Sequence, residues 1–171
     1  AAGTTRGAIY WHFKDKADLF NAMMERVTLP LEQTLVVAYV EQSAHPVAEI
    51  RSAMLEALRL IATDAQTRRV LQIATHQVEY TADMGAVLER HLSVHGGCVE
   101  RNLVALQRAF AARNQTPPIA LDFAARGLQV LVEGLVHQWL LNPEAFDLQA
   151  NGLAALDVYL GGLGLHDTAP G

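Results

Sequence analysis

The sequence has little of several residue types, and each shortage excludes a class of protein. It contains one cysteine, Cys98, so no disulfide can form within the chain. No uncharged apolar run approaches the roughly 20 residues that a membrane-spanning helix needs, although 51% of the residues are hydrophobic. The seven histidines are scattered and form no Cys/His cluster of the kind that binds a structural metal. We therefore expect a protein of the reducing cytoplasm, without a metal, a cofactor or a membrane partner.

The sequence also lacks the patterns of an enzyme and of a β-fold. No nucleophile–base set and no phosphate-binding loop stand out, so we expect no catalytic activity. The pairs His76/Glu79 and His91/His95 each place two potential metal ligands on one helix face, but neither has further ligands at a suitable spacing. No segment alternates between apolar and polar residues as a strand does, and apolar residues recur at three- and four-residue steps. The predicted fold class is all-α.

Positive charge is scarce and unevenly distributed. The chain has 13 lysines and arginines against 18 acidic residues, a net charge of −5, which by itself argues against a nucleic-acid partner. Both lysines, Lys14 and Lys16, nevertheless fall in the first 16 residues, where three basic residues stand against one acidic residue and give a net charge of +2. A positive segment on an acidic body is typical of a phosphate-binding module joined to another domain. A chance cluster in a solvated helix–turn explains the charge equally well.

Helix boundaries follow from capping residues, prolines and glycines. Asp15 can cap a helix that Pro30 bends or breaks and that ends before Pro46. Further helical segments follow, and the residues that separate them are Asp64, Gly96 with Gly97, Asn114 to Pro118, and Asn142 with Pro143. We expect the glycine pair to weaken or kink the helical path, and residues 164–171 to be a frayed tail.

One block of the sequence resembles a known family. Residues 2–20 read Ala-Gly-Thr-Thr-Arg-Gly-Ala-Ile-Tyr-Trp-His-Phe-Lys-Asp-Lys-Ala-Asp-Leu-Phe. This block resembles the TetR-family signature, especially in the branch that represses multidrug efflux pumps (the AcrR/TtgR type). Residues 67–69 and 134–148 also look like that branch. The resemblance implies a helix-turn-helix remnant at residues 1–16, a connecting helix at residues 17–45, and a ligand-binding and dimerisation domain at residues 46–165. It further implies that the first helices of the family fold precede Ala1, so we expect an N-terminally incomplete chain.

By this resemblance, the first segment reads double-stranded operator DNA. The second helix of a helix-turn-helix enters the major groove, and its N-terminal residues contact base edges and phosphates. The implied DNA-contacting residues are Thr5, Arg6, Gly7, Tyr10, Trp11, His12 and Lys16. For the aromatic residues among them, packing inward is the alternative. A two-fold homodimer would place two such helices on a palindromic operator.

The same resemblance implies a pocket for bulky apolar or amphipathic compounds that loosen DNA binding. Such pockets are mostly apolar with a few polar groups. The implied pocket residues are Ile50, Ala53, Met54, Ala57, Leu71, Thr75, Val78, His95, Cys98, Asn102, Gln129, Val132, Glu133, Val136 and His137. Glu133 has two interpretations: a carboxylate that faces a cationic or hydroxylated ligand, or a surface residue paired with an arginine or histidine.

Two apolar segments, at about residues 119–141 and 147–163, carry the dimer prediction. Helices this apolar need cover, which in this family a second subunit provides through a four-helix interface; burial within one chain is the alternative. The candidate interface residues are Leu128, Leu131, Leu135, Trp139, Leu156, Tyr159 and Leu160. Two functions stay open. The first is a ligand-released repressor of a multidrug efflux operon, and the second is a helical binding and dimerisation module without DNA binding in this form.

Overall fold

The computed structural model describes residues 12–27, 45–76 and 85–166, and the regular structure in these ranges is entirely helical. Residues 16–27 form one helix. It is followed by α3 (Pro46–Thr63), α4 (Ala65–His76), α5 (Gly85–Arg113), α6 (Leu121–Leu141) and α7 (Leu148–Gly162). The all-α prediction is thus confirmed. Within the same ranges, no helix combines the length and hydropathy that crossing a membrane requires.

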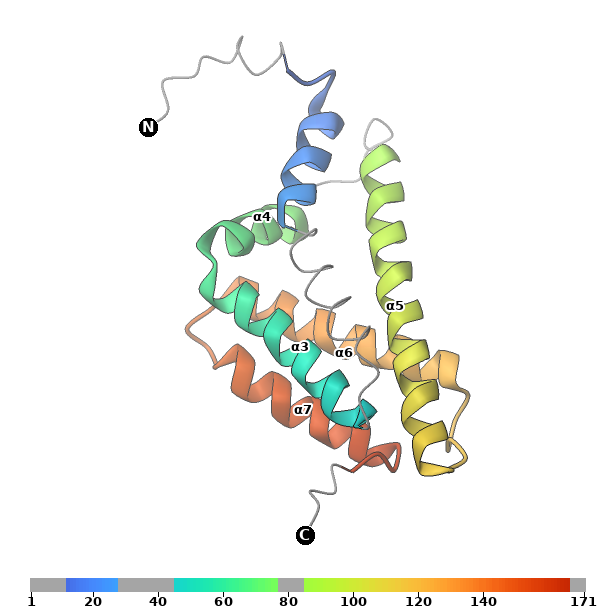
Figure 1. Cartoon of the computed structure of the whole chain (residues 1–171). Coiled ribbons are helices and arrows are strands. Elements are labelled where there is room, and N and C mark those ends of the chain that lie inside the picture. Colours follow the sequence, from blue (N-terminus) through green and yellow to red (C-terminus); the bar gives the residue numbers. More distant parts are fainter. Residues whose placement is uncertain (1–11, 28–44, 77–84, 167–171) are drawn as a thin grey trace.

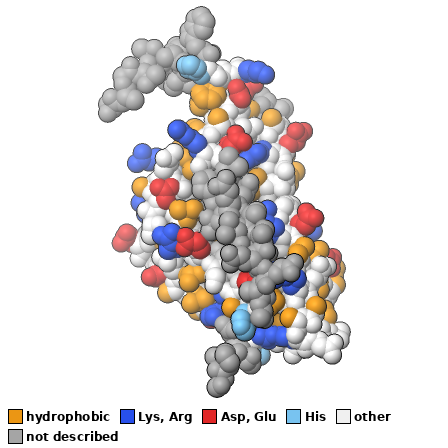
Figure 2. Space-filling model, in the orientation of Figure 1, with side chains coloured by type: hydrophobic (Ala, Val, Ile, Leu, Met, Phe, Trp, Pro, Cys, Tyr) orange, Lys and Arg blue, Asp and Glu red, His pale blue; other side chains and the backbone are white. Residues whose placement is uncertain are grey.

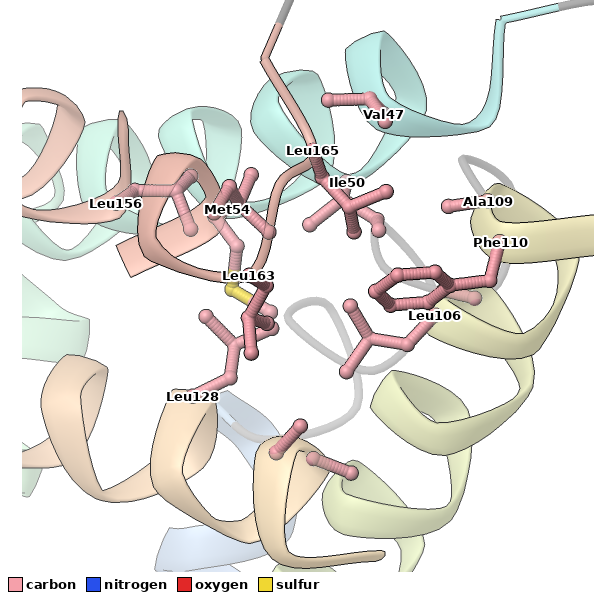
Figure 3. Close-up of a cluster of buried hydrophobic side chains, with 14 residues drawn as sticks. Val47, Ile50, Met54, Leu106, Ala109, Phe110, Leu128, Leu156, Leu163 and Leu165 are labelled. Carbon is pink, nitrogen blue, oxygen red and sulfur yellow. The ribbon is translucent and has the colours of Figure 1, made fainter. Parts of the chain in front are cut away.

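The helices pack around two apolar clusters. Helix α5 packs on α6 and α3, and α7 packs on both α3 and α6 (Figure 1). The larger cluster draws on all four, and Figure 3 shows Ile50, Leu106 and Leu128 pointing into it. All three are completely buried, at 0% exposure. The smaller cluster contains Leu58, Ile61, Trp139, Leu140 and Leu148. Together these clusters hold α3, α5, α6 and α7 as one bundle.

The helix of residues 16–27 packs between α4 and the first turns of α5 (Figure 1). Asp15 caps it as predicted, because its Oδ1 accepts a hydrogen bond from the backbone N–H of Asp18 at 2.8 Å. Ala17 and Phe20 are buried against Val87 of α5. The helix that follows the predicted DNA-reading segment is therefore in direct contact with α4 and α5.

Charged side chains of both signs are mixed on the face of the molecule seen in Figure 2. Figure 2 shows acidic and basic side chains interspersed over the described part of one face. Several arginines pair with carboxylates: Arg51 with Asp157 at 2.7 Å, Arg59 with Glu56 at 2.6 Å, and Arg108 with Glu49 at 3.0 Å. Other arginines have different partners, since Arg68 lies over the ring of Trp139 and Arg113 donates to the carbonyl of His166.

Helix α5 differs from its prediction. We expected Gly96 and Gly97 to weaken or kink the path, but α5 runs as one helix from Gly85 to Arg113 (Figure 1). Each glycine costs only about 1 kcal/mol relative to alanine inside a helix. The packing of α5 on α3 and α6 offsets that cost. Tertiary contacts therefore override the local glycine signal.

The end of α7 is fixed rather than frayed. Gly164 adopts a φ of +82°, which favours glycine. The N–H of Leu165 donates to the carbonyl of Leu160, and that of Gly164 donates to the carbonyl of Gly161, both at 2.9 Å. This paired closure turns Leu165 back into the larger cluster, where it is 1% exposed. The prediction of a frayed tail was wrong for residues 164–166, and residues 167–171 lie outside the described ranges.

The junction between α3 and α4 depends on one carboxylate. Asp64 accepts hydrogen bonds from the hydroxyl and from the backbone N–H of Thr67. These bonds, the hydroxyl first, hold the pKa of Asp64 below its usual range. Because the folded-state pKa is lowered, this stabilisation is complete above about pH 4 and is lost as the pH falls through the folded-state pKa.

We expect Asp64→Asn to remove this acid-dependent part of the stability, because asparagine keeps a capping oxygen but does not titrate. Urea unfolding at a series of pH values would measure it. The wild-type chain should be the more stable at about pH 6, and the difference should shrink towards about pH 3. A difference that stays constant over this range would contradict the assignment.

Candidate ligand-binding cavity

A cavity of about 400 Å³ lies between α3, α4, α5 and α6 and also reaches Met24 of the helix of residues 16–27. This volume is within the range of pockets that hold drug-sized molecules. Most of the predicted pocket residues line it, and these are Met54, Ala57, Leu71, Thr75, Cys98, Asn102, Gln129, Val132, Glu133, Val136 and His137. Residues from four separate helices are thus brought together around one space.

The other predicted pocket residues lie elsewhere. Ile50 and Ala53 are buried at 0% and 1% exposure, and for them the prediction was wrong. Ile50 lies one turn before Met54 on α3, where Leu106 and Phe110 of α5 fill the space (Figure 3). His95 does not line the cavity but contacts a residue that does. Val78 lies outside the described residues.

Sequence reasoning missed several wall residues, which are Met24, Ile61, His91, Val94, Arg101 and Leu140. Ile61 and Leu140 continue predicted faces by one turn, from Ala57 and Val136. The three missed residues of α5 share a face with Cys98, and only a continuous helix brings them onto it. The sequence set of His95, Cys98 and Asn102 lay on the neighbouring part of this face and left these three residues out.

One wall of the cavity is a chain of hydrogen bonds between α5 and α6. Asn102 Nδ2 donates to Gln129 Oε1 at 3.3 Å, and Gln129 Nε2 donates to Glu133 Oε1 at 2.9 Å. His95 Nδ1 lies 2.8 Å from the same carboxylate oxygen. The chain runs from Asn102, which is 1% exposed, to the Glu133 side chain, which is 45% exposed. Glu133 is thus paired with a histidine, and because it also lines the cavity its contact with a ligand stays a prediction.

Helix α4 is joined to α6 by polar and aromatic contacts beside the cavity. The rings of His76 and His137 meet edge to face with centroids 4.7 Å apart. Gln72 Nε2 donates to the carbonyl of Leu140 at 3.1 Å, and the guanidinium of Arg68 lies 5.9 Å from the ring centre of Trp139. A molecule in the cavity would therefore contact α4 and α6, which also contact each other directly.

The predicted DNA-contacting residues are only partly described. His12 and Lys16 are exposed and lie just before and at the start of the helix of residues 16–27. Outside the described ranges lie Thr5, Arg6, Gly7, Tyr10 and Trp11. Lys16 is thus exposed at the start of the helix that follows the predicted reading segment.

The predicted dimer residues divide into two groups. The side chains buried within the single chain, at 0–5% exposure, are Leu128, Trp139, Leu156 and Leu160, which corrects their assignment to a subunit interface. They face the apolar clusters because α3 and α5 cover that side of α6 and α7. The partly exposed members are Leu131, Leu135 and Tyr159.

Tyr159 joins α7 to α6 of the same chain. Its hydroxyl donates to the carbonyl of Ala124 at 2.7 Å, and burial raises the pKa of Tyr159. The outward sides of α6 and α7 instead expose large apolar side chains. These are Phe123, Val130, Leu141 and Val158, at 58–77% exposure.

The sequence and the structure both match known transcriptional regulators. Residues 45–164 match the MAATS-type transcriptional repressor, C-terminal region, and residues 1–23 match the tetR family of bacterial regulatory proteins. The HTH-type transcriptional regulator TtgR of Pseudomonas putida is 33% identical over 86% of this chain and 70% of its own length. The HTH-type transcriptional repressor BepR of Brucella suis is 30% identical over 88% of this chain and 72% of its own.

Solved structures agree with these matches. The SmeT–triclosan complex aligns with a TM-score of 0.80 at 31% identity and covers 99% of this chain and 81% of SmeT. NalD is the secondary repressor of the MexAB-OprM multidrug efflux pump in Pseudomonas aeruginosa. Its structure aligns with a TM-score of 0.80 at 32% identity, and the alignment covers 97% of this chain and 82% of NalD. The resemblance seen in residues 2–20 is thereby confirmed. The chain belongs to the TetR family of bacterial transcriptional regulators.

Proposed function

We propose that the protein represses a multidrug efflux operon and leaves its operator when a bulky apolar or amphipathic compound occupies the cavity. The observation that carries the proposal is the position of Met24. This side chain lines the cavity, and its helix begins at Lys16, next to the predicted DNA-reading segment. Ligand and DNA would therefore meet the two ends of one short helix.

The mechanism is a shift between two forms of the protein. The helix of residues 16–27 rests on α4 and α5 through Phe20, and α4 supplies Leu71 and Thr75 to the cavity. A ligand that fits better when these helices are displaced would favour the form in which the DNA-reading segments are wrongly spaced. Its effect is limited to the difference between its affinities for the two forms.

The relatives support both parts of this proposal. SmeT is known in a complex with triclosan, and NalD is the repressor of an efflux pump. The cavity of this chain has the size and the mainly apolar wall that such a compound needs. We infer that a chlorinated diphenyl ether such as triclosan is a suitable first probe, and that the operator is double-stranded DNA in the bacterial cytoplasm.

We also propose a two-fold homodimer formed by the outward sides of α6 and α7. Phe123, Val130 and Leu141 recur along one face of α6, and Val158 is 77% exposed on α7. A hollow of about 440 Å³ lies beside Val130 and is also lined by Gly134 and Phe146. An exposed apolar surface of this kind on a charged bundle needs a partner. A second copy would give two DNA-reading segments and hence a palindromic operator.

The function is tested by operator binding with and without ligand. Fluorescence anisotropy of labelled promoter DNA from beside the parent gene should rise on adding protein that carries a complete helix-turn-helix, and should fall when triclosan is added. DNA binding that no apolar compound reverses would remove the ligand-released part of the proposal. Absence of binding to that promoter at low salt would remove the repressor part.

Lys16 offers a more local test of the DNA contact. We expect Lys16→Ala to weaken binding by a similar factor on specific and nonspecific DNA, because a lysine–phosphate contact carries no sequence information. The slope of log K against log salt should become shallower by about one unit. Arg59→Ala, which removes an exposed cation on α3, is the matched control and should leave the slope unchanged. An unaltered slope for Lys16→Ala would rule out the phosphate contact.

A further inference from the structure

Arg101 enters the wall of the cavity from α5 with its hydrogen-bonding capacity partly unused. One terminal nitrogen, Nη2, donates to Cys98 Sγ at 3.2 Å. Sulfur is a weak acceptor. The Nε atom is buried and has no hydrogen-bond partner in the described part of the chain. Nε of Arg90 is in the same state, so what distinguishes Arg101 is its position in the cavity wall.

The guanidinium is held along the helix rather than extended into solvent. Arg101 shares a helical face with Cys98 and Asn102, and all three line the cavity. Its Nη1 lies over Gly97, where an added Cβ would come within 3.5 Å of it. The guanidinium thus lies beside Gly97 and Cys98, one turn before Arg101 on α5, at the cavity wall.

Arg101 differs from the arginines of the bundle that are paired with a carboxylate. Arg51, Arg59 and Arg108 each pair with a carboxylate at 2.6–3.0 Å, and Arg90 approaches Glu25 at 4.0 Å. No such ion pair involves Arg101 within residues 12–27, 45–76 and 85–166. Its positive charge is therefore not neutralised by a carboxylate of these residues.

The carboxylate that lines the cavity already has donors of its own. Oε1 of Glu133 accepts a hydrogen bond from Gln129 at 2.9 Å and lies 2.8 Å from His95 Nδ1. Neither of these partners is Arg101. Among the described residues, the cavity thus presents a carboxylate on α6 that already has hydrogen-bond partners and a guanidinium on α5 that no carboxylate neutralises. A ligand with an anionic group would complete the second site.

We propose that Arg101 anchors the ligand and that the cavity prefers amphipathic aromatic compounds bearing a carboxylate. The inference rests on the proposed ligand-binding function and adds a chemical class to it. The terminal N–H groups of the guanidinium can donate to the two carboxylate oxygens, a geometry that arginine matches well. The aromatic part would lie against Met24 and Met54, whose sulfur atoms make favourable contacts with rings.

The test uses two probes of the same shape, biphenyl-4-carboxylate and biphenyl-4-carboxamide, titrated calorimetrically into the 171-residue chain at neutral pH. The carboxylate should bind at least about tenfold more tightly than the amide, as expected for a charge-assisted hydrogen bond. Arg101→Gln should abolish this preference and leave amide affinity nearly unchanged. Arg101→Lys should restore part of it, and Arg59→Gln, the matched control, should preserve it fully.

Each other outcome decides against the inference. Equal binding of the two probes by the wild-type chain overturns it, as does a preference that survives Arg101→Gln. If Arg101→Gln does not fold, judged by thermal unfolding without ligand, the wild-type comparison and Arg101→Lys still decide. Triclosan binding without binding of either probe would refute the carboxylate preference and leave the proposed function intact. If triclosan and both probes fail to bind, the cavity is not a ligand site and both proposals fall.

Discussion

Replacing Val136 with tryptophan is expected to abolish ligand binding while the bundle remains folded. Val136 lines the cavity from α6 and is only partly buried, so an indole at this position can extend into the open space instead of displacing core side chains. The indole would occupy part of the cavity of about 400 Å³ and compete with a drug-sized compound for the space that remains. We expect triclosan affinity to fall at least about a hundredfold, close to 3 kcal/mol.

The loss of binding should have a functional counterpart. In a protein with a complete helix-turn-helix, Val136→Trp should bind operator DNA normally but remain bound when triclosan is added. Isothermal titration calorimetry and fluorescence anisotropy measure the two effects. Val104→Trp is the matched control, because Val104 is 50% exposed on α5 and does not line the cavity. Unchanged triclosan affinity in Val136→Trp would show that compounds bind somewhere else.

Most of the fold was predictable because helix ends are set by local chemistry. Asp15 caps the helix of residues 16–27, and Pro46 begins α3. Asp147 caps α7 by accepting a hydrogen bond from the N–H of Ala150 at 2.9 Å. Each of these signals acts within one turn. Gly96 and Gly97 were misleading for the opposite reason, since their effect depends on what packs against α5.

The division between core and cavity could not be read from the same pattern. Ile50 and Met54 lie on one face of α3, one turn apart, and periodicity treats them alike. The larger cluster closes completely around Ile50, whereas Met54 faces both the cluster and the cavity. That distinction depends on which side chains of α5 and α6 lie opposite each residue, which is a property of the assembled bundle.

The outward side of α6 was equally hidden, because this helix is apolar nearly all the way round. Leu128 and Val130 are two residues apart and similar in hydrophobicity, yet one is 0% exposed and the other 58%. A helix of this kind gives periodicity no polar face from which to choose a direction. The packing of α3 and α5 determines which side of α6 is buried. It therefore moves the predicted dimer surface from Leu128 to Val130.

Val130→Asp is therefore expected to convert the proposed dimer to a monomer. Two-fold symmetry places the substitution twice in the same interface, so two carboxylates would lose water without gaining a partner. Since each uncompensated buried charge costs several kcal/mol, dimer dissociation should become at least about a thousandfold easier. Sedimentation velocity at micromolar concentration should show a monomer, and operator affinity should fall because two DNA-reading segments are no longer held together. Val104→Asp, with similar exposure on α5, should remain dimeric, and a Val130→Asp protein that still sediments as a dimer would place the interface on another face.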